Sequence, residues 1–197
     1  MEQKKYELTD EVIEVCGRKL HRIRCLVDGN PYINKGELGG FIEIEDNLSQ
    51  DGDCFVCGSA KVFDNAKVSD NAKVSGDAKV YGNARVYGDA CVSGDARVYG
   101  NARVYGDAWV SGDAKVKSQN DYMVFKNFWS SGRYFTYTRS NQMWRVGCFY
   151  GTGEELIKKA YADSEDSGYH YEQIVELVRK IEEHDNFEKN KKEEKTC

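Results

Sequence analysis

The stretch ARVYGDAWVSGDAKV, residues 102–116, repeats the pattern Ala, any residue, Val every six positions. The valines keep this six-residue register far upstream without a break. They are Val56, Val62, Val68, Val74, Val80, Val86, Val92, Val98, Val104, Val110 and Val116. A short fixed period sustained over so many units is typical of a repeat architecture, in which each unit packs against its neighbours.

The spacing within one unit predicts a short strand followed by a corner. Residues two apart in a strand share a face, so Ala60 and Val62 point inward and Lys61 between them points outward. Gly, Asp and Asn follow the strands and favour corners, because they tolerate positive φ or bond to nearby backbone. Such a chain winds into a coil whose strands pair with their copies about 4.8 Å along the axis. The sequence therefore predicts a parallel β-helix.

If three strands make one coil, residues eighteen apart stack on one side of a triangular prism. The outward residues then separate into three ladders. The first side alternates opposite charges, so we expect it to be solvated scaffold. Its members are Ser59, Lys61, Asp77, Lys79, Asp95, Arg97, Asp113 and Lys115.

The second side carries only positive charge and is flanked by tyrosines. Stacked cations can bridge a phosphate or phosphodiester, and tyrosines can stack on bases. The expected ligand-binding residues are Lys67, Arg85, Arg103, Tyr81, Tyr99, Tyr87, Tyr105, Asn83 and Asn101. The alternative interpretation is that these cations keep an exposed sheet soluble while the tyrosines cover the corners.

The third side is the most apolar. Phe55, Cys91 and Trp109 form a stripe that suits a contact between subunits. The alternative is that the C-terminal part of the chain folds back over Trp109. We expect a homo-oligomer.

The repeats over about residues 38–118 resemble those of the hexapeptide-repeat, left-handed β-helix proteins, which have three strands per coil. The resemblance implies left-handed coiling, since the usual crossover rule alone favours the right hand. It also implies side-by-side trimers, so a trimer is the favoured oligomer.

Segments outside the repeats extend the resemblance. KKYELTD, GELGGFIEIEDNLSQ and MWRVGCFYGTGEELIKKAYADSEDSG resemble segments of bacterial and phage proteins that carry only a hexapeptide-transferase label or no assigned function. The resemblance implies a phage setting, and a counter-defence inhibitor fits that setting.

Four segments are expected along the chain. Residues 1–37 form a β-hairpin around Gly17 that caps the coil, and residues 38–118 form the coil, with Ile44 in the Val register and Leu48 in the Ala register. Residues 119–185 form an α+β lobe with two or three antiparallel strands and two helices. The first helix has a Thr152–Glu155 capping box, and the second runs from about residue 169 to 184. Residues 186–197 form a mobile charged tail.

An enzyme of the resembled family needs a general base. Hexapeptide acyltransferases generally use a histidine on the coil to deprotonate the acceptor. The histidines of this chain, His21, His170 and His184, all lie outside the repeats. We therefore favour a non-catalytic protein that needs no cofactor. Acyl transfer from acetyl-CoA is the first alternative, and a structural self-assembly module is the second.

Metal and redox sites are not expected. The CFVC stretch, residues 54–57, has the spacing of a zinc or redox pair, but no second pair exists, and the register points Cys54 into the core and Cys57 to a corner. Cys91 has no histidine placed to activate it. The stacked aspartates of the first side already have lysine and arginine neighbours.

Composition limits the partners. The chain has 197 residues, 40% of them hydrophobic, and a net charge of −5, so indiscriminate nucleic-acid binding is not expected. We expect no membrane association because no apolar run is long enough to span a bilayer. The N-terminus MEQKKYELTD lacks a secretory signal, and seven cysteines agree with a reducing compartment, so a cytoplasmic location is expected. The expected partner is an anionic small molecule or a protein, contacted through the second side or the C-terminal lobe.

Overall fold

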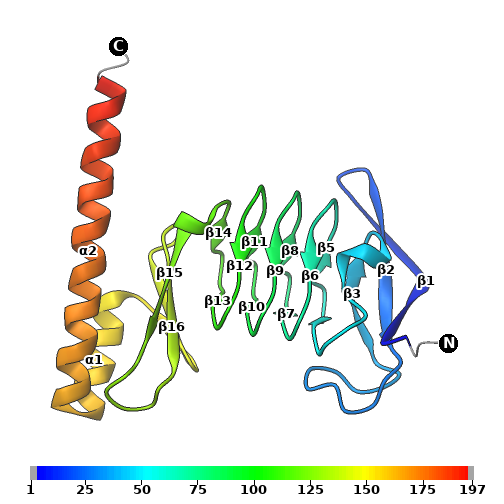
Figure 1. Ribbon diagram of the computed structural model, residues 1–197, viewed down its shortest axis with the longest axis horizontal. Coiled ribbons are helices and arrows are strands. Elements are labelled where there is room, and N and C mark those ends of the chain that lie inside the picture. The colour runs from blue at the N-terminus through cyan, green and yellow to red at the C-terminus, as the bar shows by residue number, and fades with distance from the viewer. Residues whose placement is uncertain (1–3, 195–197) are drawn as a thin grey trace.

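The computed structural model describes residues 4–194, and side chains as far as residue 191. An N-terminal hairpin, a long coil and a C-terminal lobe follow one another along the molecule (Figure 1). The N-terminal elements are β1 (Tyr6–Val15), β2 (Arg18–Cys25), β3 (Leu38–Ile42) and the 3₁₀ turn η1 (Glu45–Asn47). The coil strands are β4 (Phe55–Val56), β5 (Lys61–Val62), β6 (Lys67–Val68), β7 (Lys73–Val74), β8 (Lys79–Val80), β9 (Arg85–Val86), β10 (Cys91–Val92), β11 (Arg97–Val98), β12 (Arg103–Val104), β13 (Trp109–Val110) and β14 (Lys115–Val116).

The coil is a parallel β-solenoid with three strands per turn, as the repeat predicts. Strand β6 pairs with β9 and β9 with β12, so each strand lies beside its copy eighteen residues away. The other two sides are built in the same way, in the orders β5-β8-β11-β14 and β4-β7-β10-β13. The repeated valines and alanines are all buried in one continuous core. The left-handed sense of coiling remains a prediction.

Backbone hydrogen bonds join each coil to the next. The amide of Lys67 donates to the carbonyl of Ala84 at 3.0 Å, and the amide of Arg85 donates to that of Ala102 at 2.9 Å. Parallel pairing also sends bonds in the return direction, from strand amides of the later coil to strand carbonyls of the earlier one. Each open end of the solenoid therefore presents both N–H and C=O groups that need partners.

The N-terminal hairpin supplies hydrogen-bond donors to its end of the coil. The Tyr6 hydroxyl, which is buried, donates to the carbonyls of Glu45 at 2.9 Å and Leu48 at 2.7 Å. Lys5 is also buried, and its Nζ donates to the carbonyl of Asp51 at 3.2 Å. The β1–β2 hairpin continues the sheet of the first side through β3, so it protects that edge as well.

The C-terminal lobe supplies hydrogen-bond partners to the other end of the coil. The amide of Trp109 donates to the hydroxyl of Thr136 at 2.9 Å, and the amide of Lys115 donates to the hydroxyl of Ser140 at 2.7 Å. Each cap therefore supplies partners to backbone groups that the coil leaves unpaired at its end, as buried backbone requires.

The register predicted for the first coil is wrong. Ile42, rather than Ile44, pairs with Val62, and Leu48 takes a Val position by bridging Val68. Leu48 and Val68 are twenty residues apart, whereas the Phe55–Lys73 pair spans eighteen, so the corner between Leu48 and Phe55 holds two additional residues. These residues shift everything before them, and Ile44 is left 49% exposed.

The turn η1 is held by one buried amide. The Asn47 side chain accepts hydrogen bonds from the amides of Glu43 and Ile44 at 3.1 and 2.9 Å. It donates to the carbonyls of Asp64 and Ala66 at 3.0 and 2.9 Å. Asn47 therefore fixes the place where η1 leaves the coil.

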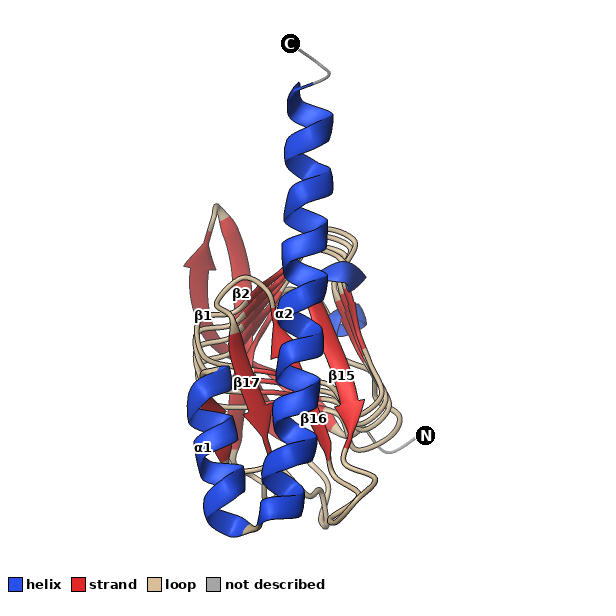
Figure 2. Ribbon diagram, turned by 90° about the vertical axis from the view of Figure 1, so that its left-hand side faces the viewer, coloured by secondary structure: helices blue, strands red, loops and turns tan. Residues whose placement is uncertain are grey.

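The C-terminal lobe contains four antiparallel strands, where two or three were predicted. Its elements are the 3₁₀ turn η2 (Gln119–Asp121), β15 (Tyr122–Lys126), β16 (Tyr134–Thr138), β17 (Met143–Val146), β18 (Phe149–Gly151), α1 (Gly153–Asp163) and α2 (Glu165–Glu194). The Thr152–Glu155 capping box is confirmed. Figure 2 shows both helices lying side by side over the sheet. Within residues 4–194, neither helix has the length and apolar character needed to cross a bilayer.

The second helix is longer than predicted. It runs to Glu194, so residues 186–194 of the expected mobile tail are helical, and residues 195–197 lie outside the described part. Glu and Lys have high helix propensity. The Lys191 ammonium also lies 3.9 Å from Glu188 and above the Phe187 ring, and such contacts between neighbouring turns stabilise a helix.

The N-terminal cap can be tested with Tyr6→Phe. The substitution removes only the hydroxyl that donates to two backbone carbonyls, so we expect the free energy of unfolding to fall by about 1–3 kcal/mol. Chemical denaturation measures this change. Tyr169→Phe is the matched control because Tyr169 is 56% exposed. Equal effects of the two substitutions would contradict the capping role.

The C-terminal cap can be tested with Thr136→Val. Valine keeps the shape of Thr136 but offers no acceptor to the Trp109 amide, so we expect faster hydrogen exchange at that amide and a loss of about 1–3 kcal/mol in the free energy of unfolding. Thr136→Ser keeps the hydroxyl and should preserve the protection. Unchanged exchange in the valine variant would show that the amide is held by something else.

Candidate functional site

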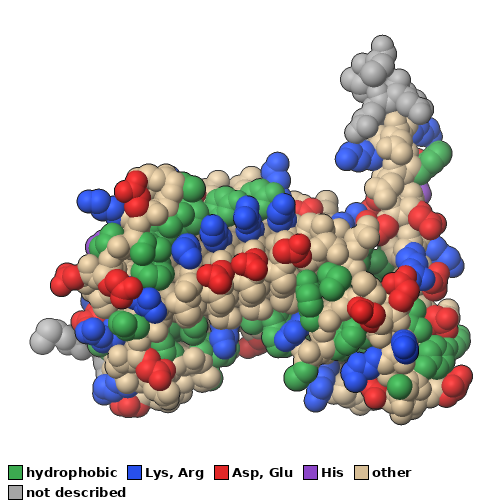
Figure 3. Space-filling view, turned by 180° about the vertical axis from the view of Figure 1, so that it is seen from behind, with side chains coloured by type: hydrophobic (Ala, Val, Ile, Leu, Met, Phe, Trp, Pro, Cys, Tyr) green, Lys and Arg blue, Asp and Glu red, His purple; other side chains and the backbone are tan. Residues whose placement is uncertain are grey.

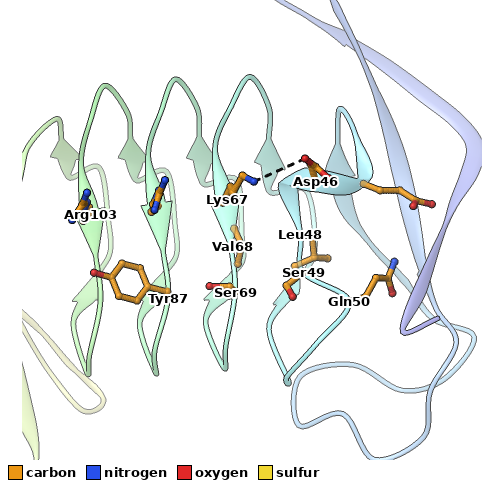
Figure 4. Close-up of a pocket in the computed structure, with 11 residues that line it drawn as sticks. Asp46, Leu48, Ser49, Gln50, Lys67, Val68, Ser69, Tyr87 and Arg103 are labelled. Carbon is orange, nitrogen blue, oxygen red and sulfur yellow. Dashed lines mark ion pairs between the residues drawn. The ribbon is translucent and has the colours of Figure 1, made fainter. Parts of the chain in front are cut away.

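An open groove of about 600 Å³ lies along the second side of the coil (Figure 4). The ladder of basic residues forms its floor, and the irregular first coil forms a wall at its N-terminal end. The lining residues are Glu45, Asp46, Leu48, Ser49, Gln50, Lys67, Val68, Ser69, Arg85, Tyr87 and Arg103.

The three predicted cations stack as expected. Strands β6, β9 and β12 pair in register, which aligns Lys67 with Arg85 and Arg85 with Arg103. Each of these residues occupies the outward position of a two-residue strand whose second residue is a buried valine. Successive cations are therefore separated by one strand spacing of about 4.8 Å.

The positive charge is concentrated toward the C-terminal half of the groove. The Lys67 ammonium lies 3.9 Å from the Asp46 carboxylate, which partly neutralises it. Among residues 4–191, no acidic side chain forms an ion pair with Arg85 or Arg103. These two guanidinium groups are exposed and have their hydrogen-bonding capacity available for an anion.

One tyrosine of the predicted site lines the groove. Tyr87 lies at the corner after β9 and stacks on Tyr105, with ring centroids 5.4 Å apart. Tyr105 lies further toward the C-terminal lobe, beside Tyr122, whose hydroxyl donates to the Arg103 carbonyl at 3.0 Å. Burial, together with the nearby Tyr105, raises the pKa of Tyr122 to about 12. Tyr87 is therefore the aromatic surface that the groove offers.

The tyrosines of the opposite corner do not line the groove. Phe63, Tyr81 and Tyr99 stack with centroid distances of 5.2 and 5.3 Å. The first of these rings packs with Leu20 and Phe41 in a small hydrophobic cluster. This corner is part of the scaffold and lies outside the groove.

The asparagines of the second side bond to one another. The Asn65 amide donates to Asn83 at 3.1 Å, and the Asn83 amide donates to Asn101 at 3.3 Å. Neither Asn83 nor Asn101 lines the groove. The two residues predicted to contact a ligand thus form a ladder that ties neighbouring coils together.

Sequence reasoning missed the wall of the groove. Asp46, Ser49 and Gln50 come from η1 and the two-residue insertion, where the repeat is irregular. Counting residues in steps of six does not predict which side chains point outward in this irregular segment. The one usable signal was the run of polar residues EDNLSQDGD, residues 45–53, just before the regular repeats.

The third side is covered by the chain itself, so the predicted contact stripe needs correction. Phe55 is fully buried, and Tyr6 packs against it edge-on with ring centroids 6.4 Å apart. The Arg145 guanidinium lies 3.9 Å above the Trp109 ring. At Trp109 the alternative prediction therefore holds, in which the C-terminal lobe folds back over this residue. Cys91 lies between them and is half-buried, and burial raises the pKa of its thiol. Phe55 is thus unavailable to another subunit.

The first side carries the expected charge rows. Figure 3 shows basic side chains running beside acidic ones along the coil. The three aspartates of this side form no ion pair within 4.0 Å among the described residues. The lysines and arginines of the neighbouring row therefore offset the negative charge at longer range, through solvent.

No histidine or cysteine among the described residues lines the groove. His21 is on β2, where its Nδ1 lies 3.2 Å from the Thr9 carbonyl, and His170 stacks on Trp129 with centroids 4.7 Å apart. His184 is exposed on α2. Cys54 is fully buried, as predicted, and lies 3.2 Å from the Lys5 ammonium. No group of three metal-ligating side chains was found in the described part of the chain.

Part of the coil matches a known family of repeats. Residues 78–94 and 96–112 match the family model described as the YdcK beta-solenoid repeat. No match was found among curated proteins. The two matched segments contain strands β8 to β13. The chain therefore contains β-solenoid repeats similar to those of that family.

Proposed function

We propose that this is a non-catalytic binding protein whose second-side groove holds a small anionic ligand, a nucleotide or a short phosphodiester. The observation that carries the proposal is the stacking of Arg85 and Arg103 one coil apart, without an acidic partner in the described chain. The Lys67–Asp46 pair lies at the other end of the same groove.

The two arginines suit a phosphate better than a single cation would. A guanidinium donates two parallel hydrogen bonds to a phosphate, and two such groups about 4.8 Å apart can hold different oxygens of one phosphate or of adjacent phosphates. Both guanidinium groups project from paired strands whose backbones are fixed by the ladder. Little backbone ordering is then needed on binding, which favours affinity.

The rest of the groove suits the remainder of a nucleotide. Tyr87 offers a ring on which a base can stack. Ser49, Gln50 and Ser69 offer hydroxyl and amide groups for sugar hydroxyls or base edges. The volume of about 600 Å³ lies within the usual range for small-molecule sites. Sequestration of such a ligand also fits the counter-defence setting that the phage resemblance implies.

In this proposal the coil binds a ligand and does not catalyse acyl transfer. No residue of the groove is a histidine, and the guanidinium donors of Arg85 and Arg103 stabilise a bound anion without activating a nucleophile. An acetyl-CoA-dependent acyltransferase with a base from outside the repeats and a purely structural module are the two competing outcomes of the test below.

Isothermal titration with a panel of linear and cyclic nucleotides and acetyl-CoA tests the proposal. We expect at least one nucleotide to bind, and Arg85→Ala plus Arg103→Ala to weaken it by at least about 100-fold, since each charged hydrogen bond contributes about 1.5–3 kcal/mol. Tyr87→Ala should weaken binding less. Binding should also fall with rising salt.

The matched control is Lys79→Ala plus Arg97→Ala, which removes two stacked cations from the first side. It should leave binding unchanged. Equal losses in the two double variants would show a nonspecific charge effect. Acetyl-CoA turnover would support the acyltransferase, and no binding by any ligand of the panel would support the structural module; either result would overturn the proposal.

A further inference from the structure

The last turns of α2 extend beyond the body of the molecule. The helix has its last buried side chain at Val178, and from Glu183 to Lys191 every described side chain is exposed except the partly covered Glu188. Figures 1 and 2 show this end of α2 projecting past the coil and the lobe. Short helices without tertiary contacts are marginal in water. A partner that covers this segment would stabilise it.

An aromatic side chain lies at the centre of the projecting segment. Phe187 is 62% exposed, and it is the one large apolar side chain between residues 183 and 191. At 100° per residue, Phe187 lies on the opposite side of the helix from Val178, which faces the lobe. Glu182 and Asp185 also lie toward the body, where Arg139 pairs with them at 3.2 and 2.8 Å. The Phe187 face therefore points away from the molecule.

Two opposite charges flank Phe187 on this outward face. Glu183 lies four residues before it and Lys191 four residues after it, and both share its face at 3.6 residues per turn. Within four residues of Phe187, this face is therefore acidic on one side and basic on the other, and Lys180 lies on the same face seven residues before Phe187. When the direction of the chain is reversed, Glu183 and Lys191 exchange places.

We propose that the end of α2 is a self-association surface that pairs antiparallel with the same segment of a second copy. The two Phe187 rings meet at a twofold axis, and each Glu183 faces the Lys191 of the other copy. A self-complementary patch of this kind is what a twofold interface requires. Parallel pairing would place Glu183 opposite Glu183 and Lys191 opposite Lys191, so the charges select the antiparallel arrangement.

The geometry of the segment permits this pairing. The body-facing side of α2 is opposite the Phe187 face, so a partner helix can lie along the outward face without meeting the lobe. In the antiparallel arrangement the two bodies lie at opposite ends of the helix pair. The contact covers only a few turns, so we expect a weak dimer whose population rises with concentration and falls with salt. The proposal is independent of the groove and of its ligand.

Analytical ultracentrifugation of the full chain over a wide concentration range, at low salt, tests the proposal. We expect a reversible monomer–dimer equilibrium. Phe187→Ala should shift it to monomer, and this loss would not come from a lost helix, because alanine has the higher helix propensity. Glu183→Lys and Lys191→Glu should each weaken the dimer at least about tenfold, because each places like charges opposite one another twice.

The charge swap separates antiparallel pairing from every other arrangement. The double variant Glu183→Lys plus Lys191→Glu restores both ion pairs only in an antiparallel dimer, so we expect it to dimerise as the natural chain does. An equimolar mixture of the two single variants should also dimerise. Lys79→Glu, on the first side of the coil, is the control and should have no effect.

Three results would overturn the proposal. The chain could remain monomeric at every concentration, or it could form an oligomer that none of the α2 variants alters. The single variants could also dissociate the dimer while the double variant fails to restore it. Circular dichroism of each variant establishes that the helix is retained.

Discussion

The hydrogen-bond ladder between successive coils is the interaction on which the rest of the structure depends. One set of bonds joins an amide to a carbonyl seventeen residues later, as between Arg85 and Ala102, and the parallel pairing of the strands adds bonds in the return direction. The ladder aligns every inward valine with the next one and every outward residue with its equivalent. It also leaves backbone groups unpaired at both ends of the solenoid, and the two caps supply their partners.

The candidate site forms where this regularity ends. A regular ladder alone gives a flat row of cations, and a flat row encloses no ligand. The turn η1 and the two-residue insertion after Leu48 raise a wall across the row, and the wall adds Asp46 beside Lys67. The result is a groove whose two ends differ in charge. Only the arginine end has uncompensated positive charge among the described residues, so the phosphate of the proposed ligand belongs there.

Much of the fold and part of the site could be predicted from the sequence, because a fixed period carries tertiary information. The six-residue spacing of Val56 to Val116 specified the solenoid, and the eighteen-residue stacking placed Arg85 beside Arg103. The rest depended on contacts outside the repeat. Nothing in the period indicates that Tyr6 covers Phe55 or that Arg145 covers Trp109, since those contacts come from segments distant in the sequence. The prediction for Ile44 was wrong because the period of the later repeats gives no sign of the two-residue insertion that shifts the register. The prediction for the end of α2 was wrong because its polar residues were interpreted as a mobile tail.

The most direct test is a measurement of trans-hydrogen-bond scalar couplings by NMR on the perdeuterated protein. The account predicts a coupling from the Arg85 amide nitrogen to the Ala102 carbonyl carbon, and an equivalent one from Lys67 to Ala84. Couplings from these amides to any other carbonyls would mean that a coil does not consist of three six-residue units. The stacked arginines, and the groove built on them, would then have no structural basis.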